Sequence, residues 1–148
     1  MDKIEQIKER FNSIAYQLGY ELVELNGIKL GGRSVIRAYI HKPGGVTIND
    51  CQTLTRAYSD YLDSEDVIHG KYTLEVSSLG LDRPLVKPDD FRRRIGELIN
   101  LILLPGSYQS KIVEGKLIVA DDKGVTLLNN GQEKFFDYNK IKRGKIIY

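Results

Sequence analysis

LEVSSLGLDRPLVKPDDFRRRIG, residues 74–96, divides the chain into two parts of different character. Leu74 and Val76 alternate with polar residues, which predicts the end of a half-buried strand. Turn-forming residues follow at once, and the two prolines after them disfavour both a helix and a central strand. Asp89 or Asp90 can then cap a short helical turn. The stretch therefore predicts a last strand, a linker and the start of a second domain.

The part of the chain before this stretch has the pattern helix, strand, strand, helix, strand. Apolar residues at helical spacing between Ile4 and Leu18 predict the first helix. Thr47 and Asp50 have the spacing of a capping box, which places the start of the second helix there. Cys51 falls on the apolar stripe of that helix and is predicted to be a small buried residue. Strands rich in branched and aromatic residues are predicted at 20–30, 33–41 and 72–77. Glycines between the first two favour a hairpin.

The part of the chain after the stretch changes to short strands separated by turns. The strands are predicted at 98–104, 110–119, 125–128, 133–137 and 146–148, with a helical turn at 138–141. This length and spacing are typical of a small closed barrel of SH3-like or Sm-like size, because closure removes exposed sheet edges. The predicted fold class is therefore α+β. It has an α-β-β-α-β two-layer domain over residues 1–81, an interdomain linker over 82–90 and an all-β barrel over 91–148.

Composition excludes several classes of protein. The 148 residues include one cysteine, so neither an internal disulfide nor a cysteine-based zinc site can form. No apolar run is long enough to span a bilayer, and the first residues are charged rather than signal-like, which predicts a cytoplasmic protein.

The net charge of +2 is too small to indicate a nucleic-acid binder, but it is unevenly distributed. Residues 1–78 carry nine Lys and Arg against eleven Asp and Glu, whereas residues 79–148 carry thirteen against nine. Such an asymmetry fits an ordinary solvated surface, or a polyanionic or ribonucleoprotein partner.

No catalytic constellation is evident in the sequence. His41 and His69 have no cysteine or second histidine at ligand spacing, which disfavours a metal site. Phosphate-loop and nucleophile-elbow motifs are missing. One cluster suggests catalysis: Ser77, Ser78, Asp82 and Arg83. A serine nucleophile needs a positioned base, however, and neither histidine is near in sequence, so only a base brought close by folding would rescue that alternative. The simpler interpretation is that the cluster bonds turn backbone and an acid. We predict no enzymatic activity, no cofactor and no metal.

Basic residues offer a possible contact with nucleic acid. The triplet 92–94 and the C-terminal residues Lys140, Lys142 and Arg143 can neutralise phosphates. The helix-strand order of the first domain is similar to that of bacterial KH domains, but the Gly-x-x-Gly loop that clamps a nucleic-acid backbone is missing. Sequence-specific RNA binding by the first domain is therefore weakly supported.

The stretch at 74–96 resembles the signature of the bacterial ribosome maturation factor family RimP. The family pattern is Tyr-x-Leu-Glu-Val-Ser-Ser-Pro-Gly, followed by Asp-Arg-Pro-Leu, by Asp-Phe and by a glycine at a helix end. The matching residues here are Tyr72, Leu74, Glu75, Val76, Ser77, Ser78, Gly80, Asp82, Arg83, Pro84, Leu85, Asp90, Phe91, Arg92 and Gly96. Asp50-Cys51 and Leu62-Asp63 also match family positions, so the resemblance runs along most of the chain. Leu79 stands where the family usually has proline, which loosens the turn without removing a polar group.

The resemblance implies an N-terminal α/β domain, a C-terminal SH3/Sm-like barrel and no catalysis. It further implies a factor that binds free or immature small ribosomal subunits and aids their maturation, with small-subunit ribosomal protein twelve and nearby ribosomal RNA as partners. We expect a monomer without membrane contact. The alternative is a stand-alone Sm-like RNA-binding regulator. The residues predicted to bind the partner are Ser77, Ser78, Asp82, Arg83, Arg92, Arg93, Arg94, Lys140, Lys142 and Arg143.

Overall fold

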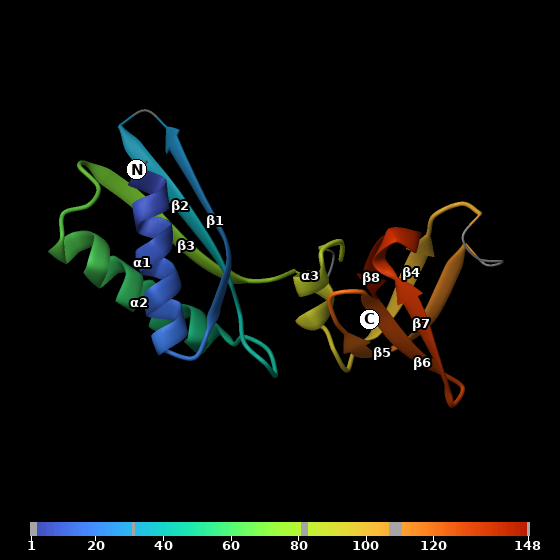
Figure 1. Ribbon diagram of the computed structural model, residues 1–148. Coiled ribbons are helices and arrows are strands. Elements are labelled where there is room, and N and C mark those ends of the chain that lie inside the picture. Colours follow the sequence, from blue (N-terminus) through green and yellow to red (C-terminus); the bar gives the residue numbers. More distant parts are fainter. Residues whose placement is uncertain (1–2, 31, 81–82, 107–110, 148) are drawn as a thin grey trace. The chain divides into compact units, whose positions relative to one another are not determined.

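The computed structural model describes residues 3–30, 32–80, 83–106 and 111–147. The chain divides into two compact units, residues 1–79 and residues 80–148 (Figure 1). The first unit combines helices with a sheet and the second is mostly strands, so the predicted α+β class is confirmed.

The first unit has the predicted order of elements. They are α1 (Lys3–Gln17), β1 (Glu21–Leu30), β2 (Arg33–His41), α2 (Ile48–Ser64) and β3 (Lys71–Ser78). The sheet order is β1-β2-β3, with β1 antiparallel and β3 parallel to β2. The predicted hairpin of β1 and β2 is confirmed, with an irregularity between Leu22 and Glu24. Both helices pack on the same face of the sheet (Figure 1).

An aromatic stack joins the two helices at the centre of this core. The rings of Phe11 in α1 and Tyr58 in α2 are parallel, with centroids 3.7 Å apart, and both side chains are fully buried. Because a buried phenol needs a hydrogen-bond partner, the Tyr58 hydroxyl donates to the carbonyl of Phe11 at 3.1 Å. Ile36 and Ile40 of β2 complete the floor of the same core.

The predicted capping box at the start of α2 is confirmed. Thr47 Oγ1 accepts a hydrogen bond from the backbone N–H of Asp50, and the Asp50 carboxylate accepts one from the N–H of Thr47. The Tyr20 hydroxyl also donates to the Asp50 carboxylate, at 2.5 Å, and Lys42 Nζ lies 3.2 Å from it. A buried carboxylate is tolerated here because all these donors point at it.

These contacts predict how stability depends on pH. The Thr47 N–H and then the Tyr20 hydroxyl hold the pKa of Asp50 well below its usual value, while the hydrogen bond to Asp50 raises the pKa of Tyr20 from 10.0 to about 12. The contribution of Asp50 is therefore present above its unfolded pKa of about 3.9 and lost as the pH falls below it. The contribution of Tyr20 is complete below pH 10.0 and lost as the pH rises toward about 12.

Urea unfolding between pH 2 and pH 12 measures both effects. Tyr20→Phe should lose less stability than the wild type between about pH 10 and 12, because no phenol remains to ionise beside Asp50. Tyr16→Phe, a change on an 84 % exposed residue, is the matched control. If the profiles of wild type and Tyr20→Phe run parallel in the alkaline range, the Tyr20–Asp50 contact does not contribute.

The second unit is a five-stranded antiparallel sheet with two short helices. Its elements are α3 (Pro88–Arg92), β4 (Leu98–Leu103), β5 (Ile112–Ala120), β6 (Gly124–Asn129), β7 (Gln132–Asp137), the 3-10 helix η1 (Tyr138–Lys140) and β8 (Ile141–Ile146). The strand order is β7-β6-β5-β4-β8. Ile99, Leu101, Leu117 and Val125 are fully buried and form the centre of its core.

The second unit differs from the prediction in two details. In the described strands β7 and β8 are the two edges of the sheet, so backbone pairing does not close the barrel. The predicted final strand at 146–148 is wrong, because β8 already begins at Ile141. The basic residues of β8 obscured its alternation of core-facing and solvent-facing residues in the sequence. Gly144 and Ile146 face the core, whereas Lys145 between them is exposed. The predicted helical turn before this strand is confirmed by η1.

The beginning of the second unit is held by backbone pairing with β8. Leu85 and Gly144 exchange two hydrogen bonds, with N···O distances of 2.9 and 2.8 Å. The Leu85 side chain is buried in the core of this unit. Residues 83–90 therefore fold with the second unit.

Candidate partner-binding surfaces

The two predicted serines lie at the end of β3. Both are exposed, and the Ser77 hydroxyl donates to the backbone carbonyl of Ser78 at 2.9 Å. The register pairs Ser77 with Tyr39 of β2. The Ser77 hydroxyl thus serves the turn, as the simpler interpretation of the sequence predicted.

An ion pair adjoins Ser77 on the same face of the sheet. Arg37 and Glu75 are opposite each other in β2 and β3, and Arg37 Nε lies 2.7 Å from a Glu75 carboxylate oxygen. Both side chains are about half exposed, so the pair is partly solvated. Together with Tyr39 and Ser77 they line a shallow depression of about 180 Å³. It offers a polar contact surface and no enclosed site.

In the second unit, Asp90 organises the turn that leads into α3. One of its carboxylate oxygens accepts hydrogen bonds from the N–H groups of Val86 and Lys87, each at 3.0 Å. The other oxygen lies 3.4 Å from Arg93 Nη1. The Asp-Phe pair in the sequence thus has two local roles, since Asp90 fixes the turn and Phe91 is fully buried in the core.

The three arginines at 92–94 differ in solvent exposure. Arg92 is half exposed and pairs with Asp89 at 3.2 Å. The side chain of Arg93 is 8 % exposed and that of Arg94 is 13 % exposed, and they pair with Asp90 and Glu97 respectively. Buried and neutralised guanidinium groups cannot reach an extended anion. Of the triplet, Arg92 thus has the most solvent-exposed side chain.

The lysines of η1 and β8 are more exposed to solvent than Arg93 and Arg94. Lys140 and Lys142 are exposed, and Arg143 is half-buried. Arg143 lies opposite Ile102 of β4, and Lys145 lies opposite Asn100. Arg143 and Lys145 are two residues apart on one strand and so face the same side of the sheet.

An aliphatic component of that face was not predicted from the sequence. Ile102 is paired with Ile112 of β5 as well as with Arg143, and Ile112 is 61 % exposed. Leu98 is also exposed and lies opposite Lys116. The nearly continuous apolar run 98–104 gave no signal of which residues face solvent. Only the strand register shows that aliphatic side chains share this surface with cations and with the acidic Glu114, which lies opposite Asn100.

The remaining predicted residues are Asp82 and Arg83. Asp82 lies outside the described residues. Arg83 is half-buried, and its backbone N–H donates to the carbonyl of Gly80 at 3.3 Å. The nine predicted residues that the structure describes therefore belong to both units: Ser77 and Ser78 to the first, and Arg83, the triplet and the C-terminal basic residues to the second.

The described residues include no group of three or more His, Cys, Asp or Glu side chains placed to hold a metal ion. Cys51 is half-buried in α2, and burial followed by the charge of Asp50 raises the pKa of its thiol. Cys51 packs against the core of the first unit, where it is half-buried and not fully buried as predicted. None of the helices built from the described residues combines the length and apolar composition needed to cross a membrane.

Residues 11–82 match the family model of the RimP N-terminal domain. The chain belongs to the RimP family. The match covers α2 and β3, so the first part of the motif quoted from the sequence, up to residue 82, lies at the end of the RimP N-terminal domain. RimP is a family of non-catalytic ribosome maturation factors, which implies a ribosome-related partner.

A solved structure also resembles part of the chain. It is the "MamB CTD magnetosome protein" of Desulfamplus magnetovallimortis BW-1, 14% identical, with a TM-score of 0.42 over 56% of this chain and 98% of that chain. The RimP assignment comes from the family model.

Proposed function

We propose that this protein is a cytoplasmic maturation factor that binds free or immature small ribosomal subunits and promotes their assembly without catalysis. The observation that supports this most strongly is the RimP N-terminal domain at residues 11–82. Small-subunit ribosomal protein twelve and the ribosomal RNA beside it are the partners we propose, with the protein acting as a monomer.

Two kinds of surface support a mixed partner of protein and RNA. Arg143, Lys145 and Arg92 provide partly solvated positive charge that can contact phosphates. Ile112 and Leu98 provide exposed aliphatic area on the same sheet as the strand that carries Arg143 and Lys145, and the buried centre of a protein interface is more apolar than its rim. A ribonucleoprotein presents both kinds of partner.

The proposed mechanism is binding, holding and release. The factor would contact ribosomal protein and nearby RNA at once and keep them in a productive arrangement until later assembly steps lock them. Binding that rests partly on exposed cations is weakened by salt. A moderate, salt-sensitive affinity lets the factor dissociate once the subunit is mature.

The salt dependence tests the cationic part of the proposal. Combined Lys140→Ala, Lys142→Ala and Arg143→Ala should lower affinity for small subunits and make the slope of log K against log salt shallower. The expected change is about one for each phosphate that the variant no longer neutralises. Filter binding or sedimentation at several salt concentrations measures this slope.

The matched control removes three exposed cations from the first unit, with Lys8→Ala, Arg56→Ala and Lys71→Ala. Its slope should equal that of the wild type. Equal slopes for the wild type and both triple variants would contradict a role for the C-terminal basic residues. Tight binding of the wild type to naked single-stranded RNA, together with a ring oligomer, would favour the Sm-like regulator instead.

A further inference from the structure

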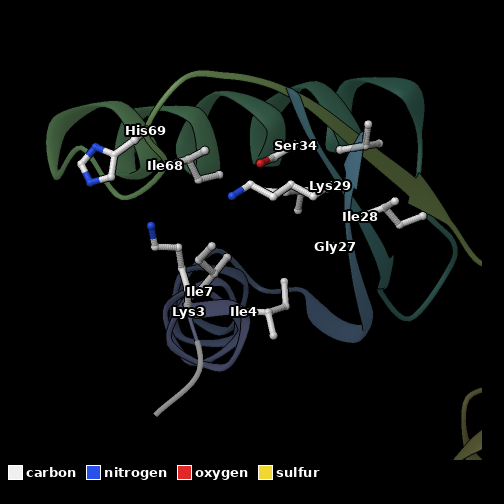
Figure 2. A pocket seen from close by; sticks show the side chains of 11 residues that line it. Lys3, Ile4, Ile7, Gly27, Ile28, Lys29, Ser34, Ile68 and His69 are labelled. Atoms are coloured by element: carbon white, nitrogen blue, oxygen red, sulfur yellow. The ribbon is translucent and has the colours of Figure 1, made fainter. Parts of the chain in front are cut away.

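A cavity of about 380 Å³ lies in the first unit, apart from the partner-binding surfaces described above. Its walls come from the start of α1, from the end of the hairpin where β1 leads into β2, and from the loop between α2 and β3 (Figure 2). This volume is at the lower end of the range for ligand-binding clefts.

A glycine in β1 lets α1 lie close to the hairpin at one side of the cavity. A Cβ atom at Gly27 would lie 2.7 Å from Ile4 Cδ1, so the glycine lets the first turn of α1 approach β1. Two residues further along β1, Lys29 is paired with Ser34 of β2. Both line the cavity, so the inner face of the hairpin stays open there.

The floor of the cavity is aliphatic. Ile7 and Ile36 are 3 % and 2 % exposed and belong to the core of the first unit. Ile68, from the loop after α2, is half-buried and lines the same space. In Figure 2 the side chains of Ile4, Ile7 and Ile68 border one opening. An apolar ligand group seated there would be removed from water.

The rim of the cavity is cationic. Lys3 from α1 and Lys29 from β1 extend toward the same opening from opposite walls (Figure 2). In the part of the chain that the structure describes, neither ammonium group has an ion-pair or hydrogen-bond partner. His69 is a third basic side chain at the rim, and it lies 3.7 Å from Asp66. The N-terminal end of α1 adds the positive end of a helix dipole on this side.

The chemistry of the lining selects among ligands. The described cavity residues include no Phe, Tyr or Trp side chain, and single-stranded nucleic acids rely on such rings for base stacking. An aliphatic floor between two free ammonium groups complements a short segment that carries both carboxylates and branched aliphatic side chains. Charge complementarity of this kind sets partner choice and register at interfaces.

We propose that this cavity is a docking site for an extended acidic–aliphatic peptide segment of a protein partner. A Leu or Ile side chain of the segment packs on Ile7 and Ile68, and flanking carboxylates pair with Lys3 and Lys29. This site goes beyond the proposed function. Its test uses no ribosomal component, so the two proposals succeed or fail separately.

The experiment is an NMR titration of the 15N-labelled full chain with two synthetic peptides, acetyl-Asp-Leu-Glu-Ile-Asp-amide and acetyl-Leu-Asp-Ile-Glu-Leu-amide. At least one should give saturable shifts centred on the amides of Gly27, Ser34 and Ile68. Lys3→Glu with Lys29→Glu should weaken this binding by about tenfold or more, because two attractive contacts become repulsive. Ile68→Ser should weaken it as well, because the ligand's aliphatic side chain would then pack on a polar group.

Matched controls separate this site from general charge effects. Lys8→Glu with Arg56→Glu makes the same change of charge at exposed positions outside the cavity and should leave the affinity unchanged. A peptide with Ser in place of Leu and Ile, or with Lys in place of Asp and Glu, should not saturate. The proposal is overturned if neither acidic–aliphatic peptide saturates, if both double variants bind alike, or if an oligouridylate shifts these amides while the peptides do not.

Discussion

Phe91→Ala should destabilise the second unit by about 3–5 kcal/mol, the usual cost of deleting a fully buried aromatic ring. Phe91 is completely buried, and its ring lies 5.8 Å from that of Tyr138, centroid to centroid. A Cβ atom at Gly144 would lie 2.8 Å from Phe91 Cε1, so the ring packs directly on the backbone of β8. Removing it leaves a cavity where α3 meets the strand that also pairs with Leu85.

Thermal unfolding and hydrogen exchange of the β4 and β8 amides measure this loss. Phe91→Leu keeps an apolar side chain of similar volume and should cost less than about 1.5 kcal/mol, which keeps the prediction testable if the alanine variant fails to fold. Phe135→Ala, at a residue 48 % exposed, is the surface control. A melting shift near zero for Phe91→Ala would contradict the packing described for this unit.

Phe11→Ala should have an effect of similar size in the first unit, again about 3–5 kcal/mol. The ring is fully buried and stacks on Tyr58 with centroids 3.7 Å apart, and its edge faces Tyr61 at 6.1 Å. Its loss removes the ring that lies between α1 and α2. The carbonyl of Phe11 remains, so the hydrogen bond from the Tyr58 hydroxyl can persist and the loss reports on packing.

Urea unfolding followed by far-ultraviolet circular dichroism measures the change, because both affected elements are helices. Tyr16→Ala removes an 84 % exposed ring from the same helix and should cost well under about 1 kcal/mol. A Phe11→Ala midpoint equal to that of Tyr16→Ala would mean that the stack contributes nothing measurable.

Local chemistry made much of the fold predictable. Thr47 and Asp50 form the capping box that their spacing indicated. Asn130 and Gly131 both have positive φ, 52° and 77°, as a tight turn between β6 and β7 requires. In each case the residues that specify the feature are neighbours in sequence, so no long-range contact was needed to infer it.

Features that depend on distant contacts were harder to predict. The C-terminal strand was placed too late, because only two of its residues, Gly144 and Ile146, are buried and three of its six residues are basic. Nothing in the sequence distinguishes Arg93 and Arg94 from Arg92. In the structure their side chains are largely buried and pair with Asp90 and Glu97. The cavity rimmed by Lys3 and Lys29 is lined by residues of α1, of the β1–β2 hairpin and of the loop before β3. These segments are far apart in sequence, so no local pattern connects them.

The central claim is that the factor distinguishes immature from mature small ribosomal subunits. Co-sedimentation of the purified protein with immature subunits, mature small subunits and mature ribosomes, at near-physiological salt, tests it most directly. We predict clear enrichment on the immature subunits and little protein on mature ribosomes. Equal recovery on all three particles, or recovery on none, would contradict a role in small-subunit maturation.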